Sequence, residues 1–153
     1  DLFLTHMPNL ISRLVFSDEK VGDAILLSLS PEQTPICYVS EDRPASIQLV
    51  RLVFNNHNPF PIILDRFECN LCHYKEPIVR NLILPVHLAV KAHSHATFSA
   101  ALDLSNSQKG IITTHSGDSM PLSMNGDIVV IAIGRCFAFP KQLSFTATIR
   151  RNA

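Results

Sequence analysis

Cysteine and histidine occur together in one short segment, Cys69-Asn70-Leu71-Cys72-His73, whose spacing could support chemistry. The C-x-x-C-H pattern is the attachment signature of c-type haem, which needs both thiols at one porphyrin edge and the histidine on the iron. Residues three apart on a straight strand point to opposite faces, and this opposes that geometry. We therefore interpret Cys69 and Cys72 as unpaired cysteines, with a haem-binding domain that uses Cys69, Cys72 and His73 as the alternative.

The same cysteines allow a zinc site as a further alternative. Cys69 and Cys72 would be joined by two of Cys37, Cys136 or the histidines, because the chain has no second C-x-x-C pair to complete a tetrahedral set. A disulfide bond is also an alternative, since four cysteines permit three complete pairings and nothing in the sequence selects among them.

Three further histidines, His87, His93 and His95, share strand parity, so a single strand would project them from one face toward a divalent metal. The solvent-exposed face of a strand explains the same spacing, and we favour it. The sequence thus predicts no metal and no cofactor. If a metal is bound, its candidate ligands are Cys69, Cys72, His73, His93 and His95.

One serine raises the question of a hydrolase. Gly117-Asp118-Ser119-Met120 and Gly126-Asp127-Ile128-Val129 resemble the Ser-Met and Gly-Asp boxes of LexA-like and signal-peptidase-like Ser-Lys proteases. In those enzymes a lysine on a much later strand takes the serine proton, whereas the only later lysine here is Lys141. We predict a hairpin turn at Asn125-Gly126 and no catalytic residue, with a hydrolase using Ser119 and Lys141 as a second alternative.

Composition restricts the partners. The chain has 13 basic and 13 acidic residues, so no net field draws it toward nucleic acid or an anionic membrane. Its longest apolar runs, 82–90 and 128–133, are shorter than the ~20 residues of a membrane-spanning helix. The chain begins at Asp1 rather than Met, so we expect a membrane-associated or extracytoplasmic location to depend on a segment that precedes it.

Short strands are the elements expected to position these residues. Apolar residues alternate with polar ones over 96–104 and again over 143–150, which indicates strands with one buried face. Further strands are expected at 24–29, 36–39, 47–54, 62–74, 82–90 and 127–139, and turns at 41–44, 55–59, 74–77, 106–110 and 125–126. Seven or eight such strands predict an all-β fold, an immunoglobulin-like antiparallel β-sandwich.

The start of the chain allows one helix. Over Pro8–Phe16 the apolar residues have helical spacing, although a strand fits nearly as well. No repeat, linker or low-complexity tract divides the sequence, so we predict a single domain over residues 1–153.

The stretch 50–62, VRLVFNNHNPFPI, resembles the opening of the LEA type 2, or WHy, domain, in which a strand runs into an Asn-Pro-Phe-Pro-like turn. The alternation over 67–74, the segment 90–104 and the glycine and proline within 131–140 are similar to later parts of that family, so the resemblance covers about 46–150. It implies an immunoglobulin-like sandwich without a known catalytic site, often carried by stress-related or membrane-anchored proteins.

The Asn-Pro-Phe-Pro turn has a physical role of its own. Prolines push the preceding residues toward extended geometry, and asparagines bond to nearby backbone, so the segment ends one strand and begins the next. Its binding-loop candidates are Asn56, Asn58 and Phe60. Because no catalytic constellation is evident, we predict a non-catalytic binding or structural module that engages a protein partner, or itself, through a sheet face or edge.

Overall fold

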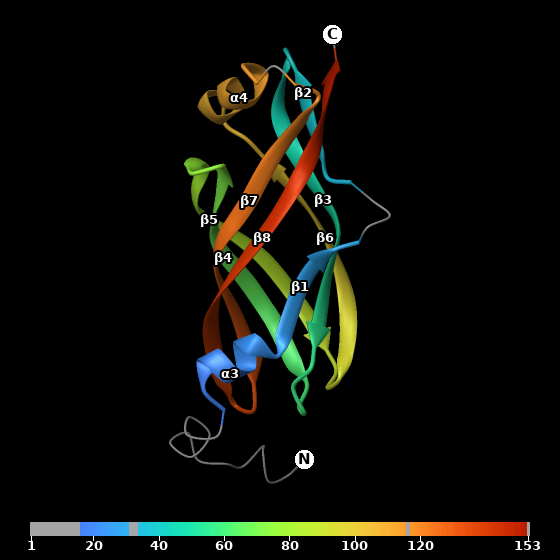
Figure 1. The fold of residues 1–153 in the computed structure, drawn as a ribbon, viewed down its shortest axis with the longest axis vertical. Coiled ribbons are helices and arrows are strands. Elements are labelled where there is room, and N and C mark those ends of the chain that lie inside the picture. The colour runs from blue at the N-terminus through green and yellow to red at the C-terminus, as the bar shows by residue number, and fades with distance from the viewer. Residues whose placement is uncertain (1–15, 31–33, 116, 153) are drawn as a thin grey trace.

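The computed structural model describes residues 16–30, 34–115 and 117–152. Within these residues the chain forms eight strands and two short helices (Figure 1). The strands are β1 (Ile25–Leu29), β2 (Ile36–Ser40), β3 (Arg43–Asn56), β4 (Ile62–His73), β5 (Glu76–Val90), β6 (Ser94–Asp103), β7 (Ser119–Ala132) and β8 (Arg135–Asn152). The helices are α3 (Asp18–Asp23) and α4 (Asn106–Thr113).

The strands form two layers that β2 joins. In the first layer, β3 pairs with β1 and β2 on one side and with β6 on the other. In the second layer, β8, β7, β4 and β5 follow one another. This arrangement is typical of immunoglobulin-like sandwiches, so the predicted all-β fold is confirmed. Its difference from a wholly antiparallel sandwich is the pairing of β2 with β8, which is parallel.

The period-two pattern of the sequence separates the core from the surface. Along β6 the inward side chains alternate with exposed ones, and along β8 the buried residues fall on odd positions from Phe137 to Ile149. Phe137 is fully buried, and burial of a side chain of this size contributes about 1.5–3 kcal/mol. The inner faces of both layers meet in one hydrophobic cluster.

Residues 106–110 begin a helix, so the turn predicted there is wrong. The Ser105 hydroxyl accepts from the backbone N–H of Gln108 at 3.3 Å, and the Gln108 side chain accepts from the backbone N–H of Ser105 at 2.8 Å. Lys109 then donates to the Glu41 carbonyl in the β2–β3 turn and to the Arg43 carbonyl at the start of β3. The polar residues that suggested a loop are the capping box and first turn of α4.

Helix α3 covers the opposite end of the sandwich (Figure 1). Its Asp18 carboxylate accepts from Arg135 at 2.7 Å and from the backbone N–H of Ala138 at 3.3 Å, which ties α3 to β8. The helix considered over Pro8–Phe16 lies outside the described residues, apart from Phe16.

Residues 127–139 form two strands and a turn, not the single strand predicted. Ile133 and Gly134 make the turn with φ values of 42° and 76°, the left-handed conformation that two-residue hairpins use. Isoleucine rarely adopts it, so the apolar run gave no turn signal. The hairpin predicted at Asn125-Gly126 is wrong, because both residues lie within β7.

Gly126 is required by a close approach of two strands. It lies opposite Cys69, where β7 pairs with β4. A Cβ atom at this position would stand 2.0 Å from the Glu68 carbonyl oxygen and 2.5 Å from the Cys69 Cα. Because both obstacles are backbone, no side-chain movement relieves the overlap.

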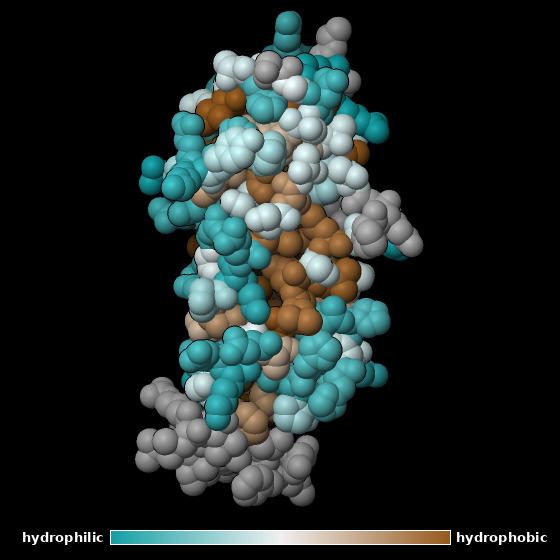
Figure 2. All heavy atoms as spheres, viewed as in Figure 1, coloured by the Kyte–Doolittle hydropathy of each residue, from teal (hydrophilic) through white to brown (hydrophobic). Residues whose placement is uncertain are grey.

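The two layers separate between β1 and the middle of β8. There, β1 pairs with β3, and β8 pairs with β2 only from Thr148 onward. Figure 2 shows hydrophobic residues at the surface in this region. Leu26 of β1 is 52% exposed, and Leu27 and Leu29 pack against the core at partial burial.

We expect Gly126→Ala to lower the free energy of unfolding by about 3 kcal/mol, because the added methyl group overlaps backbone. Gly110→Ala is the matched control: nothing lies within 4 Å of its added Cβ in α4, so it should raise stability by about 0.5–1 kcal/mol. Urea unfolding of both variants measures this. Equal stability changes would contradict the close approach of β4 and β7.

Candidate functional site

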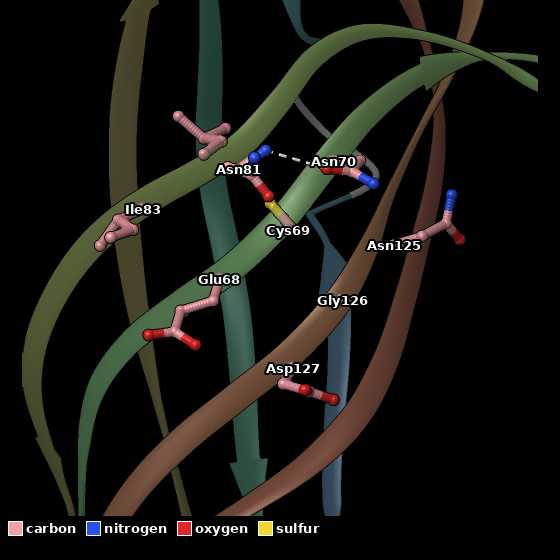
Figure 3. A pocket seen from close by; sticks show the side chains of 9 residues that line it. Glu68, Cys69, Asn70, Asn81, Ile83, Asn125, Gly126 and Asp127 are labelled. Carbon is pink, nitrogen blue, oxygen red and sulfur yellow. Dashed lines mark hydrogen bonds between the residues drawn. The ribbon is translucent and has the colours of Figure 1, made fainter.

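A shallow depression of about 430 Å³ lies over three neighbouring strands, β5, β4 and β7 (Figure 3). Polar side chains dominate its rim, and the floor runs past Cys69 and Gly126, where β4 and β7 approach closely. The lining residues are Glu68, Cys69, Asn70, Asn81, Leu82, Ile83, Asn125, Gly126 and Asp127.

Strand register places the rim residues in two rows. Glu68 of β4 stands directly opposite Asp127 of β7 and, on its other side, opposite Ile83 of β5. Two residues further along β4, Asn70 faces Asn125. The depression thus has a row with two carboxylates next to a row of two amides.

Hydrogen bonds orient the amide row. The Asn70 Oδ1 atom accepts from the backbone N–H of Asn81 at 3.0 Å, the contact that is dashed in Figure 3. The Asn125 Nδ2 atom donates to Ser123 Oγ at 3.0 Å. Each amide therefore uses one end within the protein, and its other end can bond to a ligand.

The charges at this face are mainly negative. Arg66 donates to Glu68 at 2.8 Å and also to Asp65, so one guanidinium serves two carboxylates. Within the described residues, Asp127 has no ion-pair partner. Like charges directly opposite each other on antiparallel strands destabilise a sheet. A cation bound between Glu68 and Asp127 would remove this repulsion.

The sequence did not single out this site. Glu68, Asn70, Asn125 and Asp127 occupy outward positions, which alternation along each strand can indicate. Which outward residues become neighbours depends on the register between β4 and β7, and the paired residues Glu68 and Asp127 lie 59 positions apart in sequence. No local signal reports that register.

The structure gives the Cys69, Cys72 and His73 segment no metal-binding geometry. Both cysteines are buried free thiols, and His73 Nδ1 lies 2.8 Å from the Pro121 carbonyl oxygen. Cys69 has the same strand parity as the buried Phe67 and Leu71, whereas Cys72 has the parity of Glu68 and Asn70 and is nevertheless 8% exposed, so the two thiols lie on opposite faces of β4. In the described part of the chain, no three His, Cys, Asp or Glu residues are grouped to hold a metal ion.

The remaining metal candidates are dispersed. His93 lies in the turn between β5 and β6 with a φ of 52°, and His95 lies on β6; both are exposed. Cys37 is buried on β2, whereas Cys136 is exposed on β8. All four cysteines are free thiols, so none of the disulfide pairings is formed.

Ser119 and Lys141 are far apart, so the structure contradicts the hydrolase alternative. Ser119 pairs with Thr148 at the start of β7, whereas Lys141 pairs with Gly126, seven residues further along that strand. This separation amounts to about 23 Å at 3.3 Å per residue. A lysine at that distance cannot take the serine proton.

The predicted binding-loop residues face inward. Asn56, Asn58 and Phe60 are 1%, 4% and 2% exposed. Asn56 Nδ2 donates to the Phe60 and Lys91 carbonyls at 3.0 and 3.1 Å, and Asn56 Oδ1 accepts from the backbone and side-chain N–H groups of Asn58, each at 3.0 Å. The structural role predicted for the turn is therefore observed, and these side chains are not accessible to a ligand at the surface.

No protein-family model and no curated protein matches the chain. Among solved structures, the chain is similar to a protein from Archaeoglobus fulgidus, with 15% identity and a TM-score of 0.44 over 74% of this chain and 93% of that chain. The resemblance to the LEA type 2 domain stays a prediction.

Two buried thiols should make stability fall at alkaline pH. Burial raises the pKa of Cys69 to about 12, helped by neighbouring Cys72, and burial raises the pKa of Cys37 to about 11, partly offset by Arg151. The ordinary value is 9.0, so the unfolded chain loses these protons first. The stabilising contribution is complete below pH 9 and is lost as pH rises toward 11–12.

Each thiol should contribute up to about 1.4 kcal/mol of lost stability per pH unit in this window. Urea unfolding between pH 8 and 11 measures the slope, which Cys69→Ala should reduce. Cys136→Ala, at an exposed thiol, is the control and should leave the slope unchanged. A Cys69→Ala slope equal to that of the unmodified protein would contradict the burial argument.

Proposed function

We propose that this domain is a non-catalytic binding module whose outer sheet face binds an arginine side chain of a protein partner. The observation that carries the proposal is the direct opposition of Glu68 and Asp127 beside the amides of Asn70 and Asn125. A guanidinium offers a planar set of N–H donors that matches the carboxylates of Glu68 and Asp127 and the Oδ1 atom of Asn125, whose amide uses its Nδ2 end on Ser123.

The edge of the depression also offers apolar contact to the parts of a partner that lie next to the guanidinium. Ile83 lies beside Glu68 and is 61% exposed, so it offers apolar contact to an arginine stem or to a neighbouring residue of the partner. Arg66 holds Glu68 in place without neutralising Asp127. Charge and apolar contact together favour a basic side chain next to an aliphatic one.

The wider role follows only from the resemblance. A LEA type 2 domain would supply the same kind of sandwich, without a known catalytic site, in a stress-related or membrane-anchored protein. None of the helices in the described residues is long and apolar enough to span a membrane. The proposed arginine site does not depend on this assignment.

A fluorescent, acetylated and amidated peptide, Gly-Leu-Arg-Leu-Gly, tests the proposal by anisotropy. We expect it to bind at least about tenfold more tightly than the same peptide with citrulline, which keeps the shape but lacks the charge. Glu68→Gln combined with Asp127→Asn should remove the difference between the two peptides.

Glu41→Gln combined with Glu76→Gln is the control, because it removes two exposed carboxylates elsewhere and gives the same net charge. This variant should keep the preference for arginine. Equal binding of the arginine and citrulline peptides by the unmodified protein would refute the site. So would full retention of the preference in the Glu68 and Asp127 double variant.

A further inference from the structure

The outer edge of β6 is an open strand edge. Among the described strands, β6 pairs with β3 alone. The Leu104 N–H bonds to the Ala45 carbonyl at 2.8 Å, so even-numbered residues of this strand direct their backbone groups toward β3. The N–H and C=O groups of the odd-numbered residues from His95 to Asp103 therefore point away from β3.

The edge strand of the other layer differs, because β5 carries features that hinder pairing. Pro77 and Pro85 lack a donor, and Asn81 and His87 have φ values of 55° and 50° where β5 is irregular. Proline and bulges are the usual protection of an edge against a second strand. Ser94–Asp103 has no proline and no positive φ, and the irregularity in its pairing with β3 lies on β3.

The inner face of β6 is also incompletely covered. Ala96, Phe98 and Ala100 point inward and pack against the core, yet they remain only partly buried. On an edge strand, one flank of each inward side chain has no neighbouring strand. A further strand alongside β6 would cover these apolar flanks and satisfy the outward backbone groups at the same time.

We propose that a second copy of this chain supplies that strand, so that two β6 strands pair antiparallel about a two-fold axis at Ser99. Outward backbone groups belong to odd residues, so hydrogen-bonded pairs must join odd to odd. The register centred on Ser99 uses the full strand, with about ten hydrogen bonds between the two copies.

The same register brings complementary side chains together. His95 of each copy lies opposite Asp103 of the other copy. The pairing therefore has two symmetric contacts, one at each end, in which an imidazole N–H can donate to a carboxylate. The residues between them, Thr97, Ser99 and Ala101, are small and exposed, and they permit close approach. No like charges face each other along the strand.

The interface is limited to one strand edge. The surface area that each copy would bury is smaller than the ~800 Å² that each partner buries in stable complexes. We therefore expect a concentration-dependent equilibrium between monomer and dimer. The arginine site lies on β4, β5 and β7. The Glu68→Gln and Asp127→Asn double variant should therefore dimerise normally, and failure of one proposal leaves the other intact.

Amide hydrogen exchange followed by NMR at low and high protein concentration gives the sharpest test. The amides of His95, Thr97, Ser99, Ala101 and Asp103 should gain protection with concentration. The even-numbered amides of β6 bond to β3 and should be protected at both concentrations. Uniform protection along β6, or none at any concentration, would overturn the proposal.

Sedimentation velocity of charge variants tests the register. Thr97→Lys with Ala101→Lys places lysine opposite lysine and should weaken the dimer at least about tenfold, as should Thr97→Glu with Ala101→Glu. Mixing the two variants should restore a dimer, because each lysine then faces a glutamate. Gln142→Lys with Thr146→Lys, on exposed positions of β8, is the control and should dimerise normally.

Circular dichroism and thermal unfolding of the variants confirm that each monomer is folded. A protein that stays monomeric at millimolar concentration contradicts the proposal. A dimer that both β6 variants leave unchanged, or that mixing does not restore, contradicts it as well.

Discussion

The buried amide of Asn56 connects chain segments that no strand pairing joins. It lies at the junction between β3 and β4, and it bonds to the turn that follows and to the start of the connection between β5 and β6. Asn58 extends the network to the Val21 carbonyl of α3 at 3.3 Å. In the core, a polar group left without its partners costs about 1–3 kcal/mol, so this network holds only when all its segments are in place.

The position of β4 depends on this junction. β3 belongs to the first layer and β4 to the second. The turn over residues 57–61, which Asn56 holds, therefore sets where the chain enters the second layer. A slip of one residue in β4 would exchange its inward and outward side chains. Glu68 would then face the core, and the opposition to Asp127 would be lost. The buried turn therefore supports the surface site, although its side chains do not reach that surface.

The sequence predicts most of the fold because alternation is a local property. The strands over 96–104 and 143–150 follow from it directly, and the asparagine and proline residues of the turn reveal the junction. The hairpin at Ile133-Gly134 could not be predicted, because isoleucine is an unusual residue for a left-handed turn. Asn125-Gly126 has the residue types of a hairpin turn but lies within β7. Its glycine is needed there because β4 and β7 approach each other closely.

The functional candidates also show that a local sequence pattern does not report contacts between distant strands. Cys69, Cys72 and His73 are adjacent in sequence, and this spacing drew attention to them, but burial makes the thiols structural. Glu68 and Asp127 become neighbours only through the pairing of β4 with β7. Sites that arise from pairing between distant strands have no local signature.

The most direct test of the proposed site is an NMR titration of the ¹⁵N-labelled protein with the arginine peptide. We expect the amide shifts to change at residues 68–70, 81–83 and 125–127 and to remain constant along β6 and over residues 56–61. Shift changes centred on another face, or no change at saturating peptide, would contradict the assignment of the binding face.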